Sequence, residues 1–163
     1  MLKTTAKSFI ASACALLLLA AGPQPTAATT AATSADAAPA RPAYALTNRD
    51  EGCAPTIWKL PSLFAAWPSH LHPEMPFSAI FADAFPGKTM KQVLSRRGGG
   101  LRADLARHAV AALLNASSDR VDYGLSPEGV IELFNEAVTA GPLEQANVKH
   151  GLAALNRLAC PLN

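Results

Sequence analysis

The segment from Arg96 to Arg102 combines residue types that bind anions. Arg96 and Arg97 precede three glycines, and Arg102 follows them at the start of a long apolar stretch. A glycine-rich turn before a helix presents free backbone N–H groups to an anion. The run lacks the Gly-Lys-Ser/Thr ending of a P-loop, however, and glycine also supplies the positive φ that a short helix-to-helix hinge needs. We therefore expect a hinge, and the alternative is an anion site made of Arg96, Arg97, Gly98, Gly99, Gly100 and Arg102.

Asp104 and His108 follow in the apolar stretch, four residues apart on one face of a predicted helix. A surface pair between them would favour the imidazolium form of His108. As an acid–base dyad they lack a placed nucleophile. We expect the surface pair, and a small secreted hydrolase that uses Asp104 and His108 is the alternative.

Two further groups have metal-binding residue types. His70 and His72 are separated by one residue, and three glutamates recur at spacings of four, at Glu128, Glu132 and Glu136. Neither group has a nearby ligand of another type, so we interpret the histidines as surface residues and the glutamates as a solvated helix face. No metal site, cofactor or catalytic residue is assigned.

The beginning of the chain predicts export. Lys3 and Lys7 precede an apolar run, Phe9 to Gly22, that is too short to span a bilayer, and small residues around Ala28 suit cleavage after it. Residues 1–28 are thus expected to be a signal peptide. Residues 29–51 are rich in Ala, Thr and Pro without apolar periodicity, which is typical of a disordered spacer. We expect residues 52–163 to form one exported domain, in the periplasm, at the cell surface or in the medium, with no stable membrane span after signal removal.

Two cysteines remain once the signal is removed, Cys53 near the start of the domain and Cys160 near its end. Exported proteins mature where thiols oxidise, so this even count predicts a Cys53–Cys160 disulfide. Closing a loop of that length removes about 4–5 kcal/mol of unfolded-state freedom in the chain-entropy model.

The net charge argues against nucleic acid as a partner. The chain has 14 Lys and Arg against 12 Asp and Glu, and the excess lies in Lys3 and Lys7 of the predicted signal. A duplex-binding protein usually has a basic face, so we expect none here, although a local anion site is compatible with a neutral domain.

The apolar pattern predicts an all-α domain, a small bundle of four to six helices. Ser126 and Pro127 give a strong helix start, with Gly141 as the stop. The stretch after the glycines has the widest apolar arc and is expected to be the central helix, with Asp104, Arg107, His108 and Asn115 in its polar sector. Further helices are expected at about 143–158, at 88–97 and, as a short one, at 76–85, where three phenylalanines recur at spacings of four.

Several segments together resemble a known group of domains. These are "GCAPTIWK" at residues 52–59, "GGGLRADLARHAVAALLNAS" at 98–117, "VDYGLSPEGVIELFNEAV" at 121–138 and "LAALNRLACPL" at 152–162. They are similar to an uncharacterised family of exported, mostly bacterial helical domains. Those domains have a Gly-Cys-Thr-Pro-Gly-Tyr-Trp-Lys-like start, a glycine-rich turn before an Arg-His-Ala-x-Ala-Ala-Leu-Leu-Asn-like helix, and a Cys-Pro-Leu end. The resemblance implies an extracytoplasmic location and implies no activity.

These observations favour a non-catalytic exported structural or binding module whose partner is a cell-surface or extracellular protein or polymer. The competing hypotheses are the hydrolase at Asp104 and His108 and a binder of anionic polymer at the Arg96 to Arg102 turn.

Overall fold

The computed structural model describes residues 51–82 and 84–162. The predicted signal peptide at 1–28 and the predicted spacer, except for Glu51, lie outside the described residues. The all-α prediction is confirmed, because the described part contains helices and two isolated β-bridges but no strand. The α-helices are α1 (Pro55–Trp58), α2 (Met90–Ser95), α3 (Gly100–Ala116), α4 (Pro127–Ala140) and α5 (Pro142–Leu155), and the 3-10 helices are η1 (Pro61–Ala66) and η2 (Phe77–Ala79). None of these helices has the length and apolar content needed to cross a membrane.

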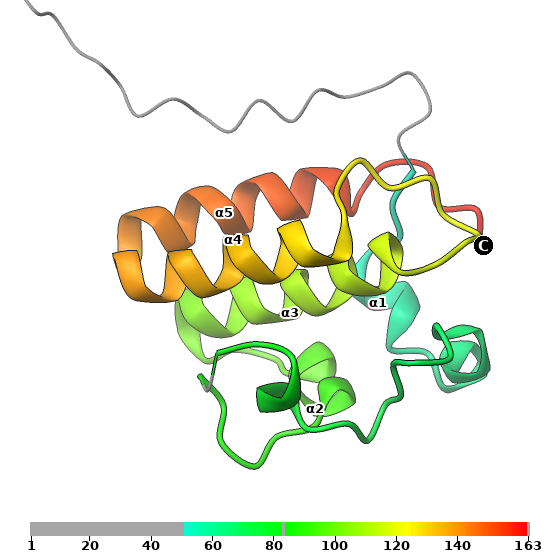
Figure 1. Cartoon of the computed structure of the whole chain (residues 1–163), viewed down its shortest axis with the longest axis horizontal. Coiled ribbons are helices and arrows are strands. Elements are labelled where there is room, and N and C mark those ends of the chain that lie inside the picture. Colours follow the sequence, from blue (N-terminus) through cyan, green and yellow to red (C-terminus); the bar gives the residue numbers. More distant parts are fainter. Residues whose placement is uncertain (1–50, 83, 163) are drawn as a thin grey trace, which may run out of the picture. The chain divides into compact units, whose positions relative to one another are not determined.

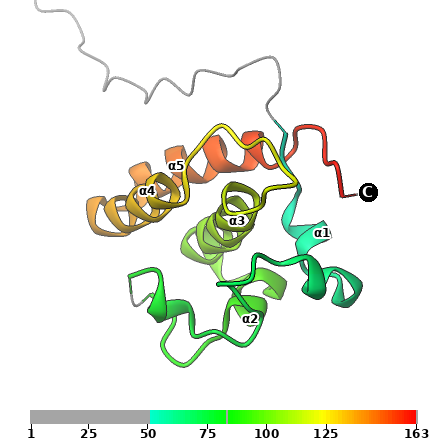
Figure 2. The same ribbon diagram turned by 45° about the vertical axis from the view of Figure 1, so that its right-hand side comes forward.

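Helix α3 is the centre of the domain. It packs against α4 and α5 on one side and against α1 and α2 on the other. Figures 1 and 2 show α4 and α5 lying side by side as one layer over α3, with α2 beyond it. Because α3 is covered on several sides, most of its residues from Ala103 to Asn115 are buried. This confirms the expectation of a central helix.

The helix starts follow from local chemistry. At α2, the Thr89 hydroxyl accepts a hydrogen bond from the Gln92 backbone N–H, and the Gln92 side chain accepts one from the Thr89 N–H, which forms a capping box. At α4, Ser126 accepts a hydrogen bond from the Gly129 N–H at 3.1 Å, and Pro127 occupies the first position of the helix. The sequence predicted both the Ser126 start and the Gly141 stop.

The glycine run between α2 and α3 forms the predicted hinge. Gly98, Gly99 and Gly100 have φ values of 70°, 98° and 76°. A side chain is strained in this left-handed region, and a Cβ on Gly99 would also press against Ala103 and Arg96. Arg96, rather than a glycine, caps the end of α2. The hinge lets α2 fold back against α3.

The predicted helix around three phenylalanines is shorter than the spacing suggested. Only Phe77–Ala79 is helical, as a single turn of 3-10 helix. Phe77 instead lies at the centre of an aromatic cluster, with ring centroids 4.8 Å from Phe81, 5.6 Å from Phe85 and 5.4 Å from Phe134. Packing against Phe134 of α4 organises this segment more than a helical repeat does.

The two ends of the domain are joined by the predicted disulfide. Cys53 and Cys160 are bonded at an S–S distance of 2.01 Å, with their Cα atoms 4.7 Å apart. The Gly52 N–H donates to the Ala159 carbonyl at 3.1 Å, and a Cβ on Gly52 would overlap the Leu155 carbonyl oxygen. Glycine is therefore required next to Cys53 so that the first segment can approach the end of α5 this closely.

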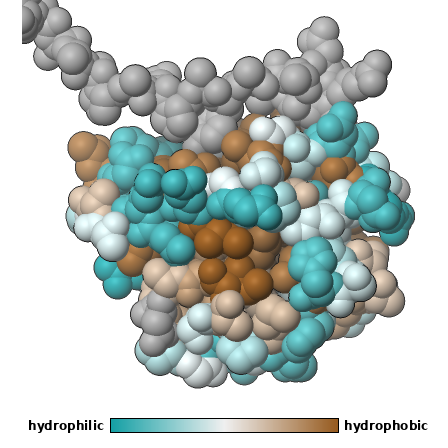
Figure 3. Space-filling view, in the orientation of Figure 1, coloured by the Kyte–Doolittle hydropathy of each residue, from teal (hydrophilic) through white to brown (hydrophobic). Residues whose placement is uncertain are grey.

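The surface of the domain is mostly polar with local apolar areas. Figure 3 shows a hydrophobic area near the centre of one face, over the region of α3 and α4, with hydrophilic residues around much of it. The large hydrophobic side chains that are most exposed are Leu60 (42%) and Leu143 (76%). Single exposed apolar residues of this kind are ordinary on soluble domains.

Candidate functional site: a basic pocket around His108

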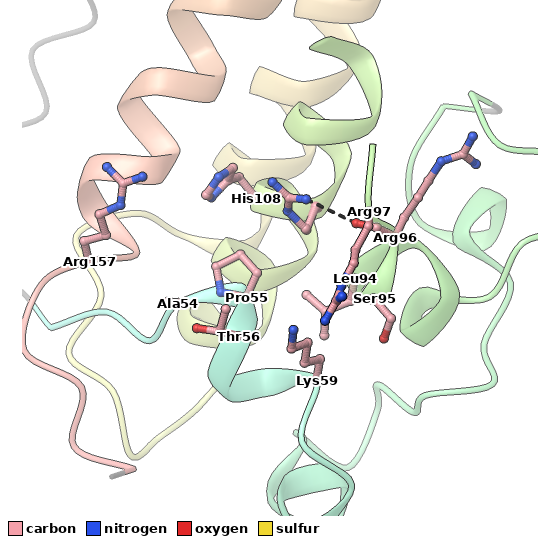
Figure 4. A pocket seen from close by; sticks show the side chains of 11 residues that line it. Ala54, Pro55, Thr56, Lys59, Leu94, Ser95, Arg96, Arg97, His108 and Arg157 are labelled. Atoms are coloured by element: carbon pink, nitrogen blue, oxygen red, sulfur yellow. Dashed lines mark hydrogen bonds between the residues drawn. The ribbon is translucent and has the colours of Figure 1, made fainter. Parts of the chain in front are cut away.

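A pocket of about 430 Å³ lies where α1, the end of α2, α3 and the end of α5 meet. Figure 4 shows its lining side chains. Those that carry positive charge are Lys59, Arg96, Arg97, Arg107 and Arg157. The other lining residues are Ala54, Pro55, Thr56, Leu94, Ser95 and His108. No Asp or Glu is among the described lining residues, so the pocket is strongly basic on an otherwise balanced domain.

Two of the five cations are already engaged. Arg107 forms an ion pair with Asp104 at 3.1 Å and donates a second hydrogen bond to the Arg96 carbonyl at 3.1 Å. The Arg96 guanidinium lies over the Phe85 ring, 5.5 Å from its centroid, and Figure 4 shows this side chain directed away from the pocket. Lys59, Arg97 and Arg157 have no ion pair within the described residues. These three are the charges available to a ligand.

His108 is the titratable group at the wall of this pocket. Burial, followed by the positive charges of Arg107 and Arg157, lowers its pKa from 6.5 to about 4, and the Asp104 charge only partly offsets this effect. Lys149 lowers the pKa further. The ring is therefore neutral at neutral pH. Its Nδ1 atom is buried and has no hydrogen-bond partner in the part of the chain that the structure describes.

The predicted surface pair of Asp104 and His108 is wrong. Asp104 pairs with Arg107 instead, because Arg107 is three residues away and offers a charged fork to the carboxylate. His108 is partly buried among cations, which favours the neutral ring and not the imidazolium that the spacing suggested. Helical spacing indicated which residues are neighbours but not which of them would pair.

Asn115 was expected in the polar sector of α3, yet it is fully buried. Its Oδ1 accepts hydrogen bonds from the Cys53 N–H at 3.0 Å and from Trp58 Nε1 at 2.7 Å. Its Nδ2 donates to the Cys53 carbonyl and to Asn156 Oδ1, and Asn156 Nδ2 donates to the His108 carbonyl. This network fixes α1 and the end of α5 against α3. It thereby positions the two walls that supply Lys59 and Arg157 to the pocket.

Only some of the predicted anion-site residues line the pocket. Arg96 and Arg97 line the pocket, whereas Gly98, Gly99, Gly100 and Arg102 are not part of its lining. The pocket faces α1 and α5 and not the glycine turn itself. The anion site at the turn stays a prediction, and the pocket beside it is a different site that shares two of its arginines.

The remaining candidate ligands lie at the surface. His70 and His72 are exposed, as are Glu128, Glu132 and Glu136. Within residues 51–82 and 84–162, no three residues of metal-binding type come together.

Sequence reasoning missed Lys59 and Arg157 as site residues. They are separated by almost the whole domain in sequence and meet only because the disulfide and the Asn115 network join its ends. No local pattern marks either residue as part of a binding site, because each is a single cation in a segment whose other residues are structural.

No protein family, curated protein or solved structure matches this chain. The site is therefore interpreted from its own geometry.

Proposed function

We propose that this protein is a non-catalytic exported module that binds an anionic ligand in the basic pocket around His108. The observation that carries the proposal is the lining of that pocket, where Lys59, Arg97 and Arg157 come from separate elements and have no ion pair within the described residues, and where no Asp or Glu is among the described lining residues. Like charges brought together raise the free energy of the folded protein, and a bound anion offsets that cost. The three cations that have no ion pair within the described residues therefore suit an external counter-ion.

The disulfide supports the exported part of the proposal. Cys53–Cys160 bonding is typical of proteins that mature in an oxidising compartment. It agrees with a signal peptide at residues 1–28 and with the resemblance to exported helical domains. N-terminal sequencing of the protein recovered from the periplasm or medium of an expressing bacterium tests this part, and we expect the mature chain to begin close to Thr29. A chain that begins at Met1 and is found only in the cytoplasm would contradict it.

The pocket gives little support to a hydrolase. Thr56 and Ser95 bring hydroxyl groups to the same pocket as His108, but no hydrogen bond joins either of them to the ring within the described residues. A ring whose pKa is near 4 is also a weak general base, and Asp104 orients Arg107 rather than His108. A screen for hydrolysis of peptides, esters and glycans should show no turnover. Turnover that disappears in His108→Ala would overturn the non-catalytic assignment.

Thermal unfolding in the presence of anions tests the binding function. Phosphate, sulfate, malonate and heparin are added in turn at constant ionic strength, since a ligand that binds the folded state raises the midpoint of unfolding. We expect at least one of them to raise it in the wild type and to have little effect in the Lys59→Gln/Arg97→Gln double variant. If no anion stabilises the wild type, the proposed function is wrong.

Two arginines outside the pocket provide matched controls. Arg120→Gln removes an exposed positive charge remote from the lining, and it should leave the anion effect intact. Arg102→Gln removes the last cation of the glycine turn. If Arg102→Gln abolishes the effect and the double variant does not, the anion binds at the turn and not in the pocket.

A further inference from the structure

We propose that the basic pocket binds a phosphate-type oxyanion and that His108 takes up a proton as this anion binds. The inference rests on the proposed function and adds the ligand class and its coupling to pH.

The arrangement of the donors favours a phosphate group over a carboxylate. Lys59 follows α1, Arg97 lies after α2 and Arg157 lies after α5, so the available charges come from different parts of the fold. Figure 4 shows Lys59 and Arg97 to one side of His108 and Arg157 to the other. A phosphate group presents three or more oxygens pointing in different directions, whereas a carboxylate presents two oxygens in one plane. Donors that lie on both sides of His108 match the first geometry better.

Neutral groups of the lining agree with this ligand. The hydroxyls of Thr56 and Ser95 are further donors for phosphate oxygens. Pro55, Ala54 and Leu94 supply an apolar wall, and the volume of about 430 Å³ lies within the range of small-molecule pockets, which is about 300–1,000 Å³. There is thus room for a phosphate ion or for a phosphate ester with a small organic group.

Proton uptake follows from the charges that surround His108. They come from every element around the pocket: Lys59 at α1, Arg96 and Arg97 after α2, Asp104 and Arg107 on α3, and Lys149 and Arg157 on and after α5. Among these residues only Asp104 is negative, and it forms an ion pair with Arg107. After burial, this positive excess is the second reason that the ring stays neutral. A bound dianion cancels much of this excess and so favours the imidazolium.

The unpaired Nδ1 atom of His108 supports a role for the ligand at the ring. Nδ1 is closed off from solvent and has no hydrogen-bond partner among residues 51–82 and 84–162. An imidazolium carries a proton on both nitrogens, and a buried N–H without an acceptor is costly. We expect the ring to turn toward the anion on binding, so that an anion oxygen accepts the hydrogen bond that the protein does not provide.

Calorimetric titrations with four probes test the ligand class. Inorganic phosphate, phenyl phosphate and malonate are compared at pH 7.5, because malonate is a dianion with planar carboxylates. We expect phosphate or its ester to bind at least about fivefold more tightly than malonate, a difference of about 1 kcal/mol. If phenyl phosphate binds more tightly than inorganic phosphate, the ligand is a phosphate monoester. If the two bind with equal affinity, the ligand is the free phosphate ion. Malonate binding as tightly as both would overturn the phosphate assignment.

Sulfate is the fourth probe, and it is used to measure the number of protons that the protein takes up when the anion binds. It does not titrate near neutral pH, so any proton exchanged on binding belongs to the protein. Titrations at pH 5.0–5.5 in buffers of different ionisation enthalpy should show an uptake of more than about half a proton per sulfate, because the free ring is then mostly neutral and the bound ring mostly charged. His108→Asn should bind sulfate without this uptake, while the exposed His150→Asn control should retain it. An uptake that is absent in the wild type, or unchanged in His108→Asn, would overturn the coupling.

The outcomes separate this inference from the proposed function. If none of the probes binds, the anion-binding function itself fails. In the other case, the probes bind to the wild type and lose affinity in the Lys59→Gln/Arg97→Gln variant. If malonate then binds as tightly as phosphate, or if no proton is taken up, only the present inference fails.

Discussion

Asn115 and His108 lie about two turns apart on the same face of α3, yet their surroundings differ in one decisive respect. Asn115 is fully buried, and both its side-chain oxygen and its nitrogen have partners in the protein. His108 is partly buried, and its Nδ1 atom has no hydrogen-bond partner within the described residues. A polar group with all its partners inside the fold stabilises the structure. A polar group that lacks one within the described residues leaves a hydrogen-bonding capacity unused at the wall of the pocket.

The two residues are also connected. Asn156 accepts a hydrogen bond from Asn115 and donates one to the backbone carbonyl of His108. The hydrogen bonds of Asn115 therefore help to hold the backbone at His108 in place, while the His108 ring takes no part in them. This predicts that changes at Asn115 act mainly on stability and that changes at His108 act mainly on the pH dependence and on anion binding.

The largest effect should come from Asn115→Ala. It leaves the Cys53 N–H, the Cys53 carbonyl and the Trp58 Nε1 without their Asn115 partner, each costing about 1–3 kcal/mol, so we expect a loss of about 5 kcal/mol in the free energy of unfolding. Chemical denaturation measures this loss. Asn147→Ala, which removes an exposed side chain bonded only to Glu144, is the control and should cost less than about 0.5 kcal/mol. Equal losses in the two variants would remove the distinction between the regions.

Cys160→Ser should have the next largest effect. The bond closes a loop with a sequence separation of 107, and losing it should cost about 4 kcal/mol, largely through the freedom gained by the unfolded chain. Thermal unfolding with and without a reductant measures this. The helical signal of the folded variant should persist at low temperature, because α3, α4 and α5 retain their mutual packing. If both thiols of the unreduced wild type react freely with an alkylating agent, the disulfide is absent.

His108→Asn should have a smaller effect that depends on pH. The folded-state pKa of His108, about 4, lies below the unfolded value of 6.5, so between these values the unfolded chain binds more protons than the folded one. The wild type must therefore lose stability through His108 as the pH falls from about 6.5 to about 4. His108→Asn should lose less over the same range, as measured by denaturation at several pH values. His150→Asn controls for the loss of an imidazole elsewhere on the surface. If the slopes of His108→Asn and the wild type coincide, His108 is not held neutral by the fold.

Local sequence signals predicted much of the fold. Ser126, Pro127 and Gly141 set the bounds of α4 because capping and proline chemistry act within one turn. The glycines at 98–100 predicted the hinge for the same reason. The disulfide was predicted from cysteine count and the expected compartment, and it is confirmed.

Other features depend on contacts that local patterns do not contain. Phe77 and Phe81 were expected on a short helix, but packing against Phe134 replaced most of it with a single turn. The residue type of Asn115 does not show that it is buried, since most asparagines lie at the surface. Its burial depends on Trp58 and Cys53, which are more than fifty residues away in the sequence.

The candidate site was predicted only in part. Arg96 and Arg97 were recognised because they adjoin the glycine turn, and both line the pocket. Lys59 and Arg157 carry no local signature, since isolated cations are common on protein surfaces. The pocket exists only after the ends of the chain are brought together, so its charge could not be read from a window of sequence.

The pKa of His108 in the free protein tests the central claim most directly. It is obtained from the ring signals in an NMR pH titration, first without added anion and then with saturating sulfate. The account predicts a pKa near 4 without sulfate, because burial, Arg107 and Arg157 disfavour the imidazolium, and a clear rise toward 6.5 when sulfate binds. A pKa at or above 6.5 in the free protein that does not change with sulfate would contradict it.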